Sequence, residues 1–78
     1  MSLASQLYDV LSSTFEVALS EINDKSTPAS IGGWDSYSHL NMVLALEKEF
    51  RISIPMEEAI KMTSVQDIRL IIEKLVGN

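Results

Sequence analysis

Apolar side chains recur at a spacing of three or four residues in several stretches of this chain, and this spacing constrains the fold more than any other feature. Such a recurrence places the apolar side chains along one face of an α-helix. The first stretch covers residues 3–22 and predicts a first helix of that length. Its apolar stripe consists of Leu7, Tyr8, Val10, Leu11, Phe15, Ala18, Leu19 and Ile22.

Further helices are predicted in the second half of the chain. A second helix is expected from Ser36 to Phe50, and a short third helix from Pro55 to Met62. Proline suits the first turn of a helix, and acidic residues are favoured near that end. The residues expected on the buried face of the second helix are Leu40, Val43, Ala45, Leu46 and Phe50.

The last helix is expected to start at Ser64, a favoured N-cap residue, and to end near Gly77. Its apolar face consists of Val65, Ile68, Ile71, Ile72 and Leu75. Met42, Met56 and Met62 are expected to fill the core or a groove, because the flexible thioether side chain adapts to irregular space.

The segment between the first two helices, residues 23–33, breaks the pattern with Pro28, Gly32 and Gly33. Proline lacks a backbone donor and glycine permits unusual dihedral angles, so a long loop is predicted there. No helix can bury its apolar face alone, and no stretch is long enough to imply a sheet. We therefore predict an all-α fold, a four-helix bundle with three longer helices and one short helix, as a single domain over residues 1–78.

Composition argues against several classes of function. The formal net charge of −5 opposes binding to nucleic-acid phosphates and favours basic protein partners. One His and no Cys are too few ligands for a structural zinc site, so no metal site is expected. No apolar run reaches the roughly 20 residues that a membrane span needs. We expect a cytoplasmic monomer that neither binds nucleic acid nor inserts into a membrane.

Asp35 and Ser36 lie at the predicted junction of the loop and the second helix, and both residue types are favoured as helix caps. One interpretation is a plain cap with no chemical role. However, only one residue can occupy the cap position. If Asp35 occupies it, the Ser36 hydroxyl is spare at a helix N-terminus, where free amides and the helix dipole favour an anion such as a phosphate.

Ser36 and His39 would also be neighbours on a helix, which raises the alternative of a nucleophile and its base. A hydrolase further needs an orienting acid, oxyanion donors and a pocket that excludes water. A small bundle with one His offers little room for these groups, so we predict that the protein is not an enzyme. His39 is expected to be solvated, and Trp34 to pack the loop onto the bundle.

From Gly33 to Leu75 the chain resembles the acyl carrier proteins. The residues that carry the resemblance are Asp35-Ser36, the helix LNMVLALEKEF from Leu40 to Phe50, Ile52-Ser53-Ile54-Pro55, Glu57-Glu58 and Thr63-Ser64-Val65-Gln66-Asp67-Ile68. An isolated Asp-Ser pair has no specificity, but these segments in this order do. The resemblance implies a small helical bundle that carries 4'-phosphopantetheine on a serine.

By position, the resemblance implies that Ser36 forms the phosphodiester with pantetheine. It also implies that Asp35 caps the helix and helps hold the Mg²⁺ used by the phosphopantetheinyl transferase. The implied contacts for acyl-loading enzymes and synthases with basic docking patches are the apolar Tyr37 and Leu44 and the acidic Glu47, Glu57 and Glu58. The implied function is to hold acyl intermediates as thioesters for fatty acid, polyketide or related biosynthesis.

Two residues of the same partner face depart from the family pattern. Asn41 and Lys48 stand where the common fatty-acid carriers have acids. Surface ion pairs contribute only about 0–1 kcal/mol each, so these changes would redirect the choice of partner without abolishing docking. Two alternatives stay open: an aminoacyl or peptidyl carrier of the same fold, and an acidic helical interaction module without a prosthetic group.

Overall fold

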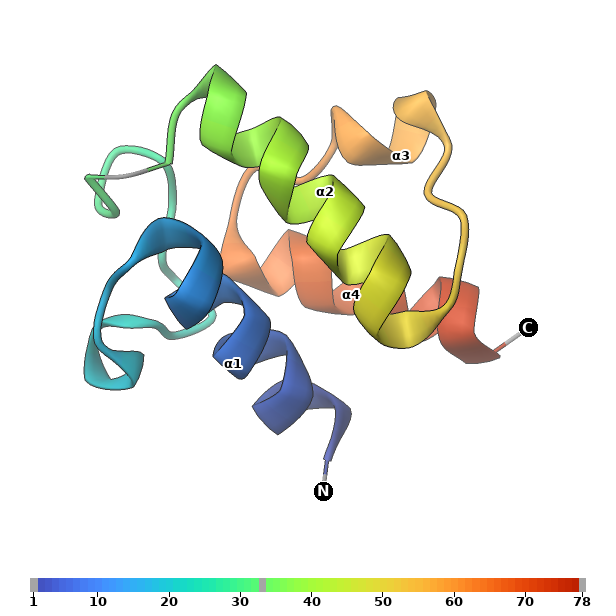
Figure 1. Cartoon of the computed structure of the whole chain (residues 1–78), viewed down its shortest axis with the longest axis horizontal. Coiled ribbons are helices and arrows are strands. Elements are labelled where there is room, and N and C mark those ends of the chain that lie inside the picture. Colours follow the sequence, from blue (N-terminus) through green and yellow to red (C-terminus); the bar gives the residue numbers. More distant parts are fainter. Residues whose placement is uncertain (1, 33, 78) are drawn as a thin grey trace.

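The computed structural model describes residues 2–32 and 34–77. The elements in this part of the chain are α1 (Leu3–Phe15), the 3-10 helix η1 (Leu19–Glu21), α2 (Ser36–Phe50), α3 (Met56–Ala59) and α4 (Val65–Gly77), with no strand among the described residues. Figure 1 shows α1 and α3 on opposite sides of α2. The predicted all-α fold, with three longer helices and one short helix, is confirmed. Across the described segments, we find no helix with the length and apolar character required to cross a membrane.

The hydrophobic core lies between α1, α2 and α4, because the apolar stripes of these three helices face one another. The side chains with no exposed surface in these helices are Leu7, Leu11, Met42, Leu46, Val65, Ile68 and Ile72. By contrast, α3 contributes no buried side chain. The stability of the bundle therefore comes from the packing of the three longer helices.

The first helix is shorter than predicted, since it ends at Phe15 rather than Ile22. Glu16 adopts the left-handed conformation and closes the helix, with its amide bonded to the Ser12 carbonyl. Beyond it, residues 19–21 form the 3-10 helix η1. Apolar residues three positions apart fit a 3-10 turn as well as an α-helix, so the pattern of Leu19 and Ile22 misled the prediction. Ile22 is still buried, but Leu19 is exposed.

The third helix is also shorter than predicted. It spans Met56–Ala59, with Pro55 as the residue before its first turn. The amides of Lys61 and Met62 then bond to carbonyls three residues back, at 3.1 and 3.2 Å, so the chain tightens into turns. These turns bring Met62 into the core, where it is buried as predicted.

Two apolar residues of α2 and α3, Leu40 and Met56, lie at the surface of the bundle. Leu40 was predicted on the buried face of α2 but is mostly exposed, because Met42 rather than Leu40 completes that face with Val43 and Leu46. Met56, which was predicted to fill the core or a groove, is exposed and lines the groove between α2 and α3. Ala45 and Phe50 are half-buried.

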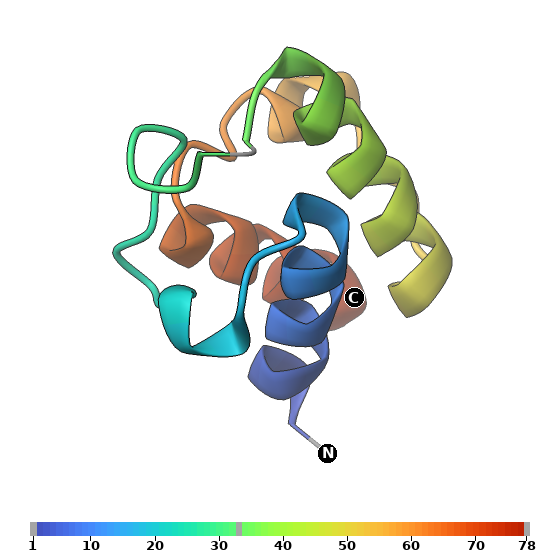
Figure 2. The ribbon, with the colours of Figure 1, turned by 60° about the vertical axis from the view of Figure 1, so that its left-hand side comes forward.

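The long connection between α1 and α2 is fixed to the rest of the bundle. The first amides of α4, those of Val65 and Gln66, donate to the carbonyls of Ser26 and Asp24 at 2.9 and 3.0 Å. Figure 2 shows this connection passing beside the start of α4. The Ser64 hydroxyl adds the predicted cap by accepting the Asp67 amide at 3.1 Å. The connection thus satisfies the end of a helix that lies far away in the sequence.

Side chains attach the same connection to α1 and α4. The Asp24 carboxylate accepts hydrogen bonds from the Tyr8 hydroxyl at 2.8 Å and from two nitrogens of the Arg69 guanidinium at 2.9 and 3.3 Å. The predicted role of Gly33 in this loop lies outside the described residues. At Gly32 the backbone does not use the left-handed region that glycine makes accessible.

Candidate functional site

The corner where the loop enters α2 holds Asp35 and Ser36. Asp35 is the N-cap, and its carboxylate accepts the Ser38 amide at 2.8 Å. Ser36 is the first helical residue and is exposed. Within the described part of the chain, its hydroxyl makes no hydrogen bond. Of the two arrangements that the sequence allowed, the structure has the one in which Asp35 caps the helix and the serine oxygen is spare.

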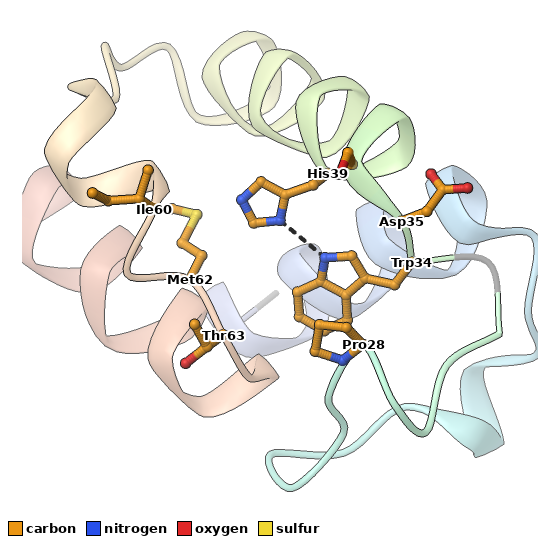
Figure 3. Close-up of a pocket in the computed structure, with 8 residues that line it drawn as sticks. Pro28, Trp34, Asp35, His39, Ile60, Met62 and Thr63 are labelled. Carbon is orange, nitrogen blue, oxygen red and sulfur yellow. Dashed lines mark hydrogen bonds between the residues drawn. The ribbon is translucent and has the colours of Figure 1, made fainter.

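The Asp35 carboxylate stays ionised at neutral pH. The hydrogen bond from the Ser38 amide lowers the pKa of this carboxyl below its ordinary value, because that bond favours the charged form. Figure 3 shows the carboxylate directed away from the pocket that the neighbouring side chains line. The anionic cap therefore lies beside Ser36, and its carboxylate does not fill the pocket.

Two hollows adjoin the serine. The larger, of about 510 Å³, lies between the loop, the start of α2 and the connection from α3 to α4; it is lined by Pro28, Trp34, Asp35, Ser36, His39, Ile60, Met62 and Thr63. The smaller, of about 310 Å³, lies between α2 and α3; it is lined by Ser36, His39, Leu40, Val43, Glu47, Ile54, Met56 and Ala59. Both hollows have a mainly apolar lining and are open to solvent, so they are surface grooves rather than enclosed cavities.

Trp34 packs the loop onto the bundle, as predicted. Its indole is only 5% exposed and stacks on Phe15 with the ring centroids 5.1 Å apart. The indole N–H donates to Nδ1 of His39 at 2.9 Å, and Figure 3 shows the two rings pointing toward each other. The tryptophan thus fixes the end of the loop directly before the Asp35-Ser36 corner.

His39 is not solvated, which corrects the prediction for this residue. It is half-buried, and both of its ring nitrogens are engaged. Because Nδ1 accepts the Trp34 N–H, Nε2 carries the hydrogen and donates to the Ala59 carbonyl at 2.9 Å. Neither nitrogen is left to accept a proton from Ser36. This geometry disfavours the alternative of a serine nucleophile with a histidine base.

The predicted apolar contacts for partners, Tyr37 and Leu44, are 75% and 55% exposed. They lie on one strip of α2 with Leu40, because residues three and four apart share a helix face. Met56 and Ile60 of the adjoining segment are exposed as well. The sequence analysis did not identify Leu40, Met56 and Ile60 as surface residues. The one available signal was the position of Leu40, three residues after Tyr37 and four before Leu44. We call these five residues, Tyr37, Leu40, Leu44, Met56 and Ile60, the apolar face.

The polar residues predicted to meet partners differ in their surroundings. Glu47 accepts the Ile54 amide at 2.8 Å and so supports the connection between α2 and α3. Glu58 accepts from Lys74 at 2.7 Å and lies 3.6 Å from Lys61. The bond from Lys74 lowers the pKa of Glu58, with Lys61 adding to the effect. Asn41, Lys48 and Glu57 are exposed. For all five, contact with a partner stays a prediction.

Comparison with known proteins defines the family, although no protein-family model matches the chain. The acyl carrier protein of Chloroherpeton thalassium is 36% identical over 70 residues, which cover 88% of each chain. The acyl carrier protein of Streptomyces coelicolor is 34% identical over 85% of this chain and 73% of its own length. The chain belongs to the acyl carrier protein family. A chloroplast relative, acyl carrier protein 3 of Cuphea lanceolata, is 44% identical, but the match spans only 41% of that longer protein.

The fold of the family is also the fold of this chain. The solution structure of a holo acyl carrier protein from Geobacter metallireducens superimposes with a TM-score of 0.86 over 99% of this chain and 88% of the other, at 23% identity. Membership of the acyl carrier proteins implies a carrier role and a covalently attached 4'-phosphopantetheine group. The corner fits such a group, because an exposed, unbonded hydroxyl stands at a helix N-terminus that favours a phosphate. In the described residues, no three potential ligands gather to hold a metal ion.

Proposed function

We propose that Ser36 carries the 4'-phosphopantetheine arm and that the chain presents acyl groups, held as thioesters, to enzymes of fatty acid, polyketide or related biosynthesis. One observation carries the proposal: Asp35 makes the capping bond to the Ser38 amide, so the Ser36 hydroxyl is exposed and unbonded at the first position of α2. In the complex with the transferase, Asp35 would also help hold the Mg²⁺ ion.

The protein's contribution in this function is position and recognition, not catalysis. A thioester keeps the acyl carbonyl activated for attack, and that chemistry belongs to the arm. Tethering raises the effective concentration of the carbonyl at each partner's active site. The chain therefore needs a reactive hydroxyl and a docking surface, and we propose that it is a carrier without enzymatic activity.

The apolar face is the docking surface that we propose for the transferase, the acyl-loading enzymes and the synthases. Five exposed apolar residues next to an attachment point are typical of a protein interaction site. Asn41, Lys48 and the acidic Glu57 are exposed around them, while Glu47 and the lysine-paired Glu58 are half-buried. The net charge of −5 would steer basic partner patches toward it. We place this carrier in the cytoplasm as a monomer, where the lack of cysteine suits a reducing environment.

The test is pantetheinylation of the purified chain, followed by intact mass. Incubated with coenzyme A, Mg²⁺ and a phosphopantetheinyl transferase, the protein should gain one phosphopantetheine as adenosine 3',5'-bisphosphate leaves. Ser36→Ala should gain nothing. Ser38→Ala, a serine two positions further along α2, is the matched control and should be modified like the unchanged protein. If several transferases leave the mass unchanged, an interaction module without a prosthetic group is the better account.

A further inference from the structure

The apolar face continues beyond α2 onto α3 through two large side chains. Met56 begins α3 and Ile60 follows it, and they are 81% and 71% exposed. The hydrophobic core does not require them, because α3 contributes no buried side chain. Exposed apolar side chains that gather in one place mark a surface that another molecule covers. The position of these two residues shows which molecule that is.

Both residues adjoin the attachment serine. Ser36 lines the smaller hollow together with Leu40 and Met56. It also lines the larger hollow together with Ile60, which Figure 3 shows on the opposite side of that hollow from Asp35. An enzyme that reacts at the Ser36 hydroxyl itself has to approach this close to α2 and α3, so it covers both side chains. An enzyme that reacts at the far end of the arm does not have to.

The acidic side chains near this surface are largely engaged within the protein. Glu58 is 2.7 Å from the ammonium of Lys74 and 3.6 Å from that of Lys61. Glu47 accepts the Ile54 amide at 2.8 Å. A carboxylate that is already paired has to give up its partner before it can bind a basic side chain of another protein. Ion pairing across the contact is therefore weak at these two positions.

The negative charge of the chain is concentrated away from α2 and α3. Residues 36–62 hold four acidic and three basic side chains, whereas residues 1–35 hold five acidic side chains and one basic side chain. Charge outside a contact changes mainly the rate of association, while the contact itself sets the lifetime of the complex. The net charge thus acts on the approach of a partner, and the apolar face on its retention.

We propose that the phosphopantetheinyl transferase docks on this carrier with an uncharged apolar recess that covers Met56 and Ile60, so that apolar burial rather than ion pairing holds the complex. This inference rests on the proposed carrier function. A basic patch in the same place would lose its hydration against apolar side chains without gaining a partner. An apolar recess gains roughly four-fold in affinity for each methylene that leaves water.

The test measures initial rates of phosphopantetheine addition with coenzyme A, Mg²⁺ and the transferase of the organism that makes this carrier. Varying the carrier concentration gives kcat and KM. Ile60→Ala should raise KM roughly ten-fold, and Met56→Ala roughly five-fold, because each removes apolar surface from the contact. The value of kcat should stay the same, since the Ser36 corner is untouched.

Ile60→Glu separates the two kinds of partner surface by the sign of its effect. Against an apolar recess the new carboxylate loses hydration and finds no partner, so KM should rise roughly a hundred-fold, beyond the effect of Ile60→Ala. Against a basic patch the same carboxylate would form an ion pair and KM would fall. A lower KM for Ile60→Glu than for the unchanged protein overturns the inference.

Salt gives an independent measurement. The rates are compared at about 0.1 M and about 1 M sodium chloride, over which the screening length falls from about 10 Å to about 3 Å. The ratio of KM between Ile60→Ala and the unchanged protein should be the same at both concentrations. Glu57→Gln should raise KM only about two-fold at low salt, and this effect should vanish at high salt. A larger effect of Glu57→Gln than of Ile60→Ala would contradict apolar docking.

Leu19→Ala is the matched control, because Leu19 is also an exposed apolar residue but belongs to η1, which Figure 1 shows away from α3. It should leave KM unchanged, and an increase as large as that of Ile60→Ala would overturn the inference. Intact mass separates the two proposals. If the unchanged protein gains no arm, both are lost. If it gains the arm and KM is the same in Ile60→Ala and Met56→Ala, only the apolar recess is lost.

Discussion

The two sides of α2 are held in different ways. Toward α1 and α4, α2 packs against side chains with no exposed surface, among them Leu11 and Ile68. Toward α3, it faces a helix without a buried side chain, whose Met56 is 81% exposed. The firm side fixes the position of Ser36, while the α3 side has polar contacts but no buried side chain of α3. In the proposed function, both properties would serve a carrier that presents its cargo to several partners.

The long connection from α1 to α2 belongs to the firm side despite its length. Its Asp24 joins Tyr8 of α1 to Arg69 of α4, and its carbonyls satisfy the first amides of α4. Loop length alone is therefore a poor guide to local stability in this protein. The number of hydrogen bonds, ion pairs and buried side chains on each side of α2 is the better guide.

The largest expected difference between the two sides is the cost of shortening an apolar side chain. Leu11→Ala should lower the free energy of unfolding by about 3 kcal/mol, because it leaves a cavity in a tightly packed core. Ile60→Ala, on the apolar face, should change it by less than about 0.5 kcal/mol. Urea unfolding followed by circular dichroism measures both. Similar losses of unfolding free energy at the two positions would contradict the difference between the two sides of α2.

A smaller effect on the free energy of unfolding is expected from the hydrogen bonds that Asp24 of the long connection accepts. The hydrogen bonds from Arg69 and then Tyr8 to Asp24 hold the pKa of this carboxyl below its ordinary value. Asp24→Asn should cost about 1 kcal/mol of unfolding free energy at neutral pH, since the ion pair is partly exposed and screened. The measurement is urea unfolding at a series of pH values.

The sign of the pH dependence follows from the direction of the shift. A carboxyl with a lowered pKa in the folded state stabilises the protein above its unfolded pKa, about 4, and the stabilisation is lost as the pH falls through the folded value. The gap between the unchanged protein and Asp24→Asn should therefore close on acidification. Asp9→Asn, at an exposed position of α1, is the matched control and should show no such gap. A gap that stays constant down to acid pH would argue against the ion pair.

The smallest expected effect concerns the residues that end α1 and α2. Both residues have the same left-handed backbone conformation. Glu16 and Arg51 have φ angles of 56° and 55°, a region that glycine adopts without strain. Glu16→Gly and Arg51→Gly should each raise the free energy of unfolding by about 0.5 kcal/mol, because relief of strain slightly exceeds the entropy that glycine loses. Thermal unfolding measures the gain. If only Arg51→Gly raised the free energy of unfolding, the stability of the α3 side would depend more on the connection from α2 to α3.

The sequence predicted best what depends on local chemistry. The start of α2, with Asp35 as cap and Ser36 spare, follows from the preferences of neighbouring residues, and so does the Ser64 cap of α4. The early end of α1 was missed because η1 satisfies the same apolar spacing. His39, Glu47 and Glu58 acquire partners from other segments, and no local pattern in one sequence contains that information.

Trp34 is the one tryptophan of the chain, and its indole, which lines the larger hollow, donates a hydrogen bond to His39. Indole emission shifts in wavelength and intensity when the polarity around the ring changes. The native fluorescence of this protein is thus a built-in optical signal for events at the Ser36 corner. Loading and unloading of cargo should be measurable in real time, without any added dye.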